Sequence, residues 1–381
     1  MFPIPIISSL RVQPSNPGIK TLTTGPEAKS VVLQYNSGET YALGANTSGM
    51  YGTGTTTDIT GNWALLRNDV RLFACCGNFS ILITKDNKVY GSGSLNTIFT
   101  SALGYSISNS TTYQDITSAF SRFDISAIQA IQGYNDTPAR LFVVDGSGQI
   151  WGIGSNQYYA LGAGSGTGTY NWTALTSGTN VKKIQCTLYG TWILKNDGTA
   201  WRCGTNSVAT LGFGSKTSTQ TTFGQYTPGT GLTVLDVGAG QYNCTLLLSD
   251  GTIRTCGASY GTGNGTTTGQ LAFYNPGLSA INRISSMNFY STFVIGASQM
   301  MSTGDNNSGR LAISTSTSPT NFVACAGTVQ SQTLSSITYM CNIVNASYYV
   351  YQGLVYAAGG AAMTLGTTNT PVYRLMPTPY K

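Results

Sequence analysis

The sequence has no histidine among its 381 residues. This absence excludes nucleophile systems that need a histidine base, such as Ser-His-Asp and Cys-His, and every metal site with a histidine ligand. Cysteine pairs with the Cys-x-x-Cys spacing of zinc sites are also missing. We therefore expect neither a bound metal nor a cofactor.

Charge is scarce as well. Charged residues make up 8% of the chain, whereas about 25% is usual in a soluble domain. The net charge of +6 comes from 19 basic and 13 acidic residues, and the basic residues form no run. Proteins that bind nucleic acid cluster their cations against the phosphate backbone, so no nucleic-acid partner is expected.

Long apolar runs are absent. No segment approaches the roughly 18 to 20 apolar residues of a membrane helix, so membrane insertion is not expected. Residues 1–16 lack a basic leader and are interrupted by Pro3 and Pro5, so we expect no secretory signal. Low charge combined with abundant Thr, Ser, Asn, Gly and Tyr is typical of adhesins and of surface proteins of virus particles.

What the sequence does have is a repeat of about 50 residues. A glycine ends a short apolar segment in each of seven units: Gly44, Gly93, Gly154, Gly204, Gly257, Gly304 and Gly359. Six residues before each glycine lies a turn position, occupied by Gly38, Asn87, Gly148, Gly198, Gly251, Ser298 and Gly353. Glycine and asparagine tolerate positive φ, and such a residue between two apolar segments predicts a β-hairpin.

Seven hairpin units of this size cannot each bury a core alone. A closed ring buries every sheet against its neighbours and leaves only short edges. The sequence therefore predicts an all-β, seven-bladed β-propeller; a sandwich or an open solenoid fits the constant six-residue offset less well. We assign residues 29–381 to the propeller and residues 1–28 to an N-terminal segment. That segment either closes the ring, with Met1–Ile7 beside residues 372–375, or forms an arm that docks on another protein.

Two stretches carry a family resemblance. Residues 145–156 (DGSGQIWGIGSN) with 160–164 (ALGAG), and residues 196–206 (NDGTAWRCGTN) with 211–214 (LGFG), resemble the repeat of the regulator of chromosome condensation family. The resemblance extends over residues 29–375 and implies a seven-bladed propeller. Its best-known members act on a small GTPase and on chromatin, and others are inhibitors, bacterial surface proteins and phage virion proteins.

The chain departs from that family in one informative way. Family units usually carry histidines shortly after a glycine and before an inner strand, where this sequence has residues 78–80 (NFS), 241–243 (QYN) and 288–290 (NFY). It also lacks an equivalent of the acidic working surface of the best-known members. We therefore do not transfer their activity, because fold alone does not determine function.

Five of the eight cysteines occupy two kinds of repeat position. Cys75, Cys186 and Cys341 lie twelve residues before the turn, and Cys203 and Cys256 lie one residue before the repeat glycine. Other units have small or apolar residues there, so we expect small buried side chains and free thiols. An even number of cysteines leaves at least one disulfide open as the alternative.

Four of the eleven aspartates, Asp86, Asp145, Asp197 and Asp250, are explained by hairpin turns. Blade loops that bring Asp58, Asp115 and Asp305 together would give the paired carboxylates of a glycosidase. Solvated loop carboxylates explain the same residues more simply. We therefore predict that the protein is not an enzyme.

Tyrosines in loops are the predicted partner contacts. The longest interval of the repeat carries insertions at 105–122 and 134–138, and further tyrosines follow the repeat glycines. Tyrosine offers contact area at low entropic cost and suits protein or sugar surfaces. Packing between blades is the alternative for each one. The candidates are Tyr105, Tyr113, Tyr134, Tyr158, Tyr159 and Tyr260.

These features lead to one main functional prediction. The chain is expected to be a non-enzymatic structural or attachment protein of a virus particle: a phage tail, fibre or capsid-decorating propeller. Its blade loops would bind neighbouring virion proteins, or a host surface protein or glycan. The alternatives are a soluble interaction module in the cytoplasm or outside the cell, similar to an exchange factor or an inhibitor, and a carbohydrate-active enzyme.

Overall fold

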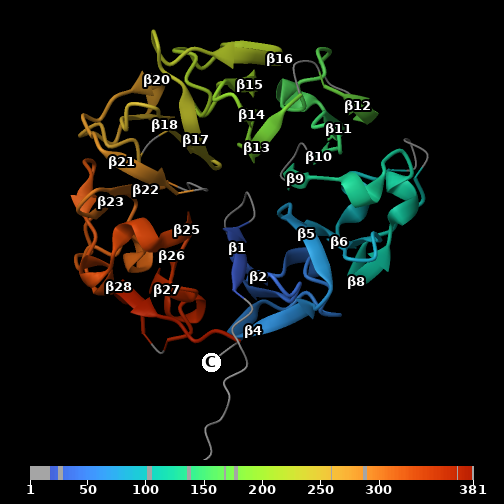
Figure 1. Ribbon diagram of the computed structural model, residues 1–381, viewed down its shortest axis with the longest axis horizontal. Helices are drawn as coiled ribbons and strands as arrows, with labels where there is room; N and C mark the ends of the chain where they lie inside the picture. The colour runs from blue at the N-terminus through green and yellow to red at the C-terminus, as the bar shows by residue number, and fades with distance from the viewer. Residues whose placement is uncertain are drawn as a thin grey trace, which may run out of the picture.

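The computed structural model describes residues 18–24, 29–100, 105–134, 139–166, 169–175, 179–258, 260–285, 290–366 and 368–379. Within them, 28 strands form seven antiparallel sheets of four strands each. The sheets are arranged around a common axis like the blades of a propeller (Figure 1). The seven-bladed prediction is therefore confirmed.

Each blade comes from one continuous stretch of chain. Blades 1 to 4 consist of β1 (Ile19–Thr24), β2 (Ser30–Tyr35), β3 (Thr40–Gly44), β4 (Ile59–Arg67); β5 (Val70–Cys75), β6 (Phe79–Thr84), β7 (Val89–Gly93), β8 (Ser110–Asp115); β9 (Ala130–Tyr134), β10 (Arg140–Val144), β11 (Ile150–Ser155), β12 (Thr169–Ala174); and β13 (Val181–Cys186), β14 (Gly190–Lys195), β15 (Ala200–Thr205), β16 (Thr219–Tyr226). Blades 5 to 7 consist of β17 (Val234–Ala239), β18 (Asn243–Leu248), β19 (Ile253–Gly257), β20 (Gln270–Tyr274); β21 (Ile281–Ile284), β22 (Ser291–Gly296), β23 (Met300–Gly304), β24 (Val323–Ala324); and β25 (Ile337–Asn342), β26 (Ala346–Tyr351), β27 (Leu354–Gly359), β28 (Thr370–Leu375).

Short 3-10 turns lie in the connecting loops. They are η1 (Thr47–Gly49), η2 (Leu95–Thr97), η4 (Thr117–Phe120), η5 (Ile125–Ala127), η6 (Gln157–Tyr159), η7 (Asn307–Gly309), η8 (Thr328–Ser331), η9 (Leu334–Ser336) and η10 (Ala361–Met363). Within the described residues, no helix is long and apolar enough to cross a membrane.

The four strands of a blade differ in burial. The first strand of each blade lies nearest the axis (Figure 1) and is called the inner strand here. The second strand is almost completely buried in every blade, as in β2 and β6. The fourth strand, called the outer strand, is mostly exposed or half-buried, as in β16, where Phe223 is the single buried residue. The apolar layer that holds the ring together is therefore built mainly from second strands.

The repeat glycines end the third strands for a steric reason. All seven have φ between 96° and 157°, a region that side chains rarely adopt. A Cβ atom on Gly93 would lie 2.2 Å from the carbonyl oxygen of Asn78, and one on Gly204 would lie 2.2 Å from that of Tyr189. Each repeat glycine therefore marks where the loop before the second strand passes against the third strand.

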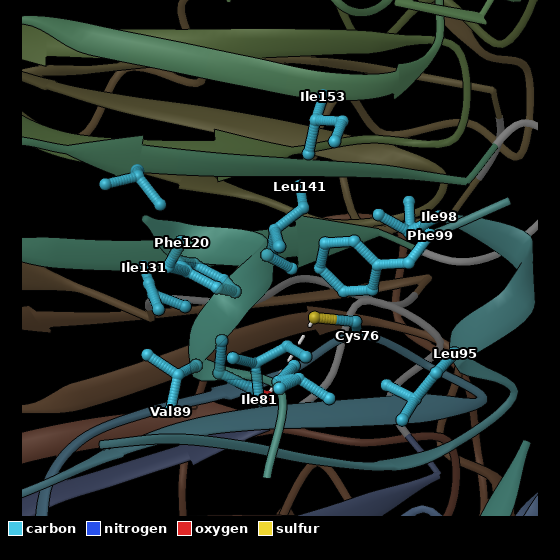
Figure 2. Packing of buried hydrophobic residues seen from close by; sticks show 14 of the residues in the cluster. Cys76, Ile81, Val89, Leu95, Ile98, Phe99, Phe120, Ile131, Leu141 and Ile153 are labelled. Atoms are coloured by element: carbon cyan, nitrogen blue, oxygen red, sulfur yellow. Dashed lines mark hydrogen bonds between the residues drawn. The ribbon is translucent and has the colours of Figure 1, made fainter. Parts of the chain in front are cut away.

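Apolar side chains fill the space between neighbouring blades. Figure 2 shows the cluster between blades 2 and 3, where Ile81 and Val89 of one blade pack towards Leu141 and Ile153 of the other. Cys76 lies at its centre, and all eight cysteines of the chain are buried free thiols. The prediction that they are small buried side chains is confirmed.

The N-terminal boundary differs from the predicted one. β1 pairs with β2, so the sheet of blade 1 already includes Ile19–Thr24, although we had placed the start of the propeller at residue 29. Met1–Ile7 and its predicted pairing with residues 372–375 lie outside the described residues. In the described residues blades 1 and 7 share no sheet, and Trp63 Nε1 donates across their junction to the carbonyl of Pro377 at 3.0 Å.

A β-bulge recurs in the inner strands. In six blades the pairing register with the second strand skips the second residue of the inner strand. The skipped residues are Lys20, Arg71, Lys182, Leu235, Asn282 and Thr338. A bulge leaves its extra residue outside the sheet ladder and re-aims its side chain. These six residues therefore have backbone groups free for contacts with a neighbouring blade.

Candidate functional site: a tyrosine-bearing loop face

The two ends of the propeller differ. One end, called the loop face here, carries the loops from first to second strands and the longer loops from third to outer strands. The latter are the described parts of 45–58, 94–109, 156–168, 206–218, 258–269, 305–322 and 360–369. The opposite end, called the hairpin face, carries the tight turns between second and third strands. Loops on a rigid frame are the usual place for binding residues.

An asparagine organises the long loop in four blades. The side-chain oxygen of Asn46, Asn156, Asn206 or Asn306 accepts from the backbone N–H five residues later at 2.9–3.1 Å. Its side-chain nitrogen donates to the carbonyl nine residues later at 2.5–2.9 Å. All four side chains are buried. One side chain therefore holds each of these loops closed at both ends.

The same loops contact the outer strand of the next blade. In blade 1, Gly54 N–H donates to the carbonyl of Thr111 at 2.8 Å. The ring of Tyr113 lies against Gly52, where an added Cβ would be 2.4 Å from a ring carbon. Three further blade junctions repeat this contact, with Phe223 on Gly162, Phe273 on Gly212 and Phe322 on Gly263.

Tyr113 is therefore a structural residue, which corrects its predicted role in partner binding. Its hydroxyl is 2.9 Å from Ser80 Oγ, and burial raises the pKa of its phenol. Tyr134 is also corrected, because it is completely buried with the guanidinium of Arg140 4.6 Å from its ring centroid. The rest of the predicted insertion, residues 135–138, lies outside the described residues.

Tyr105 lies on the loop face but is half-buried. Its ring contacts Phe99 edge to face at 5.4 Å, and burial raises the pKa of its phenol. Tyr260, in the long loop of blade 5, is 37% exposed. Tyr260 is therefore available to a partner, whereas Tyr105 belongs mainly to the packing of its own loop.

Tyr158 and Tyr159 have an unusual backbone. Both have left-handed conformations, with φ of 59° and 58°. The equivalent residues of two other loops are a serine followed by a glycine: Ser48 with Gly49, and Ser308 with Gly309. A tyrosine thus stands at a position where glycine fits without strain. The Tyr158 ring packs against Tyr189 of the next blade at 4.6 Å.

Three tyrosines on this face are missing from the predicted set. Tyr189, Tyr242 and Tyr290 each stand directly before the second strand of blades 4, 5 and 6. The rings of Tyr242 and Tyr290 stack at 4.3 Å with an interplanar angle of 6°. Their constant position directly before the second strand is a signal that the repeat itself contains.

The structure does not bring the three candidate carboxylates together. Asp58 and Asp305 lie in loop-face loops of blades 1 and 6, whereas Asp115 ends β8 at the hairpin face. Asp58 accepts from Asn46 N–H at 3.1 Å, Asp305 pairs with Arg310 at 2.7 Å, and Asp115 accepts from Thr117 N–H at 2.9 Å. These contacts explain the carboxylates as loop-organising residues and correct the glycosidase alternative.

The described residues also contain no cluster of three or more cysteine, aspartate or glutamate side chains with the arrangement of a metal site.

Comparisons with known proteins show which solved structures this architecture resembles. No family model and no curated protein sequence matches the chain. Yeast Prp20p, described with its binding to Gsp1p and histones, is similar with a TM-score of 0.62 and 13% identity over 81% of this chain and 77% of its own. Human WBSCR16 has a TM-score of 0.70 and 13% identity over 90% of this chain and 94% of its own.

Yeast RCC1 (Prp20) bound to Kap60 is similar as well, with a TM-score of 0.61 and 14% identity over 86% of this chain and 77% of its own. Likeness at such identities establishes fold and leaves function open. The chain is thus a seven-bladed β-propeller with the architecture of RCC1-like propellers.

Proposed function

We propose that this chain is a non-catalytic protein-binding module whose contact surface is the loop face of blades 3 to 6. One observation carries the proposal: the loop tip of blade 3 holds two tyrosines, Tyr158 and Tyr159, in left-handed conformations. A non-glycine residue in that region costs about 1 kcal/mol or more. Such strain clusters at binding sites and switch regions, and both tyrosines lie half-buried in the loop-face turn η6.

The chemistry of the face fits a protein surface. Within the described loop-face residues of blades 3 to 5, Lys216 is the single charged side chain. The aromatic pairs Tyr158–Tyr189 and Tyr242–Tyr290 each bridge two neighbouring blades, and the closed propeller holds them rigid. Rigid tyrosines offer large amphipathic contact area with little loss of entropy on binding.

The fold likeness supports a protein partner in general. Prp20p is described with binding to Gsp1p and histones, and yeast RCC1 is described in complex with Kap60. The likeness favours the soluble interaction module over the attachment protein of a virus particle. A place in a virus particle gains no support from these comparisons and stays a prediction, which mass spectrometry of purified particles tests.

The experiment compares two tyrosines of equal exposure in blade 5. Tyr260, at 37%, lies on the loop face, and Tyr274, at 36%, lies on the outer strand β20. Cross-linked complexes are isolated from the cells that make the protein, with wild type, with Tyr159→Ser plus Tyr260→Ser, and with Tyr274→Ser. We expect one partner that is retained by wild type and by Tyr274→Ser and lost with the double variant. A partner retained equally by all three proteins would contradict the proposal.

A further inference from the structure

A cavity lies at the centre of the ring. Its volume is about 620 Å³, and inner strands of six blades line it, for example with Gln132, Asp236, Arg283 and Tyr339. Asn196, in the turn between β14 and β15, is also in the lining. The cavity therefore follows the inner strands and reaches the hairpin face at Asn196, and the loop-face tyrosines named above do not line it. Its volume is within the range of roughly 300–1,000 Å³ that small-molecule sites occupy.

The charge around this cavity is unbalanced. Its lining contains Lys182, Lys183 and Arg283 against one carboxylate, Asp236. Asp236 already pairs with Lys183 at 2.8 Å, which leaves Lys182 and Arg283 without an acidic partner in the lining. Lys and Arg supply three of the 20 lining residues, compared with 19 of the 381 residues of the chain.

Two more cations lie on the inner strands of blades 1 and 2. They are Lys20 and Arg71, both at bulge positions. Burial, the charge of Arg71 and the charge of Lys85 all lower the pKa of the Lys20 ammonium. The acidic group that acts on Arg71 is Asp124, and burial outweighs it, so the pKa of Arg71 is lowered as well. Neither side chain lines the cavity itself, where the cations are Lys182, Lys183 and Arg283.

These cations also join neighbouring blades. Lys182 Nζ donates to the carbonyl of Leu235 at 3.2 Å, and Arg283 donates to the carbonyl of Thr338 at 2.8 Å. A carbonyl needs only an N–H donor, so a neutral amide would serve this purpose equally well. An ammonium has three donors and a guanidinium has five. Donors and positive charge therefore remain at the cavity after the blade contacts are made.

We propose that the central cavity binds a small anion with two or more phosphate groups. Arg283 in blade 6 offers a planar fork of donors for a phosphate, and Lys182 in blade 4, on the other side of blade 5, offers a point charge. Inner-strand hydroxyl and amide groups, such as those of Tyr339 and Gln132, complete a polar lining. The site is separate from the loop face and does not depend on the function proposed there.

Titration calorimetry with tripolyphosphate tests the proposal on the full chain. Lys182→Gln and Arg283→Gln keep an N–H donor for the neighbouring carbonyl and remove the charge. Each is expected to weaken binding about tenfold, which corresponds to about 1.4 kcal/mol. Lys216→Gln removes the same charge from an exposed loop-face position and is expected to bind like wild type. Thermal unfolding of each variant verifies that the ring is intact.

Three results would overturn the proposal. They are no binding of tripolyphosphate at millimolar concentration, equal losses in Lys216→Gln and in the cavity variants, and binding of a glutamate-rich peptide without binding of tripolyphosphate. The last result would assign the cavity to an acidic protein segment instead. The loop-face variant Tyr159→Ser plus Tyr260→Ser should bind tripolyphosphate like wild type, so failure of one site is distinguishable from failure of the other.

Discussion

The hydroxyl of Tyr339, in the inner strand of the last blade, donates a hydrogen bond to the backbone carbonyl of Lys20, in the inner strand of the first. Lys20 is a bulged residue, so its carbonyl lies outside the ladder of its own sheet. Lys182 and the bulged Leu235 show the same relationship between blades 4 and 5. The ring is thus closed near its axis by side chains that reach the bulge of the next blade.

Removing this closing hydrogen bond should destabilise the fold. Tyr339→Phe keeps the aromatic ring and deletes the hydroxyl donor, and we expect the free energy of unfolding to fall by about 1 kcal/mol. Urea unfolding followed by tryptophan fluorescence measures the change. Tyr274→Phe, which deletes a hydroxyl from an exposed outer-strand tyrosine, is the control and should leave the midpoint unchanged. Equal midpoints for Tyr339→Phe and wild type would show that the contact is unimportant for closure.

Removing one of the four asparagines that hold a long loop should destabilise the fold more than removing the Tyr339 hydroxyl. Asn206 accepts from Leu211 N–H at 3.1 Å and donates to the carbonyls of Ser215 and Leu271 at 2.9 and 3.2 Å. Asn206→Ala leaves these backbone groups without their partner, so we expect a loss of about 2–3 kcal/mol in the free energy of unfolding. Asn282→Ala, at an exposed position of β21, is the matched control. A loss no larger than that of the control would refute the structural role of Asn206.

Sequence predicted the hairpins because their signal is local. Buried second strands are continuous apolar segments, and the repeat glycines end the third strands at a fixed distance from the turn. Outer strands were not predicted, because a strand such as Thr219–Tyr226 is rich in threonine and glutamine and half-exposed. The repeat unit is defined by the hairpin of the second and third strands, and in blade 1 the second strand begins at Ser30. The inner strand β1 precedes that hairpin and was therefore assigned to the N-terminal segment.

The candidate site was predictable only in part. The role of Tyr113 depends on Gly52 of the preceding blade, and that contact is not local in sequence. Tyr134 is buried beside Arg140, whose guanidinium donates hydrogen bonds to the carbonyls of Thr187 and Gly190 in the next blade. Contacts between blades are set by the closed ring, so a single repeat unit does not reveal them. The positions of the repeat itself do reveal Tyr189 and its equivalents.

The pH dependence of stability should be flat near neutrality and fall in alkali. The chain has no histidine to titrate between about pH 5 and pH 8. Burial raises the pKa of Cys203 and Cys341, and raises that of Cys325 to about 12. An unfolded thiol ionises near pH ~8.5. The contribution of these thiols is therefore complete below that pH and is lost as the pH rises towards their folded pKa.

Urea unfolding under reducing conditions, repeated from pH 6 to pH 10, measures this dependence. We expect one midpoint from about pH 6 to pH 8 and a decreasing midpoint above about pH 8.5. Half-buried tyrosines such as Tyr226, whose pKa burial raises to about 12, add to the alkaline loss. A urea midpoint that changes between pH 6 and pH 8, or one that stays constant up to pH 10, would contradict the assignment of buried neutral thiols.

The strained loop tip of blade 3 separates stability from binding. Tyr159→Gly relieves a left-handed conformation, so we expect the free energy of unfolding to rise by about 1 kcal/mol relative to Tyr159→Ala. Both variants remove the ring, so both should bind the partner of the loop face more weakly than wild type. Urea unfolding and binding to that partner are measured for the two variants side by side. If the glycine variant is no more stable than the alanine variant, the tip stores no strain. If both variants bind like wild type, Tyr159 is not part of the contact surface.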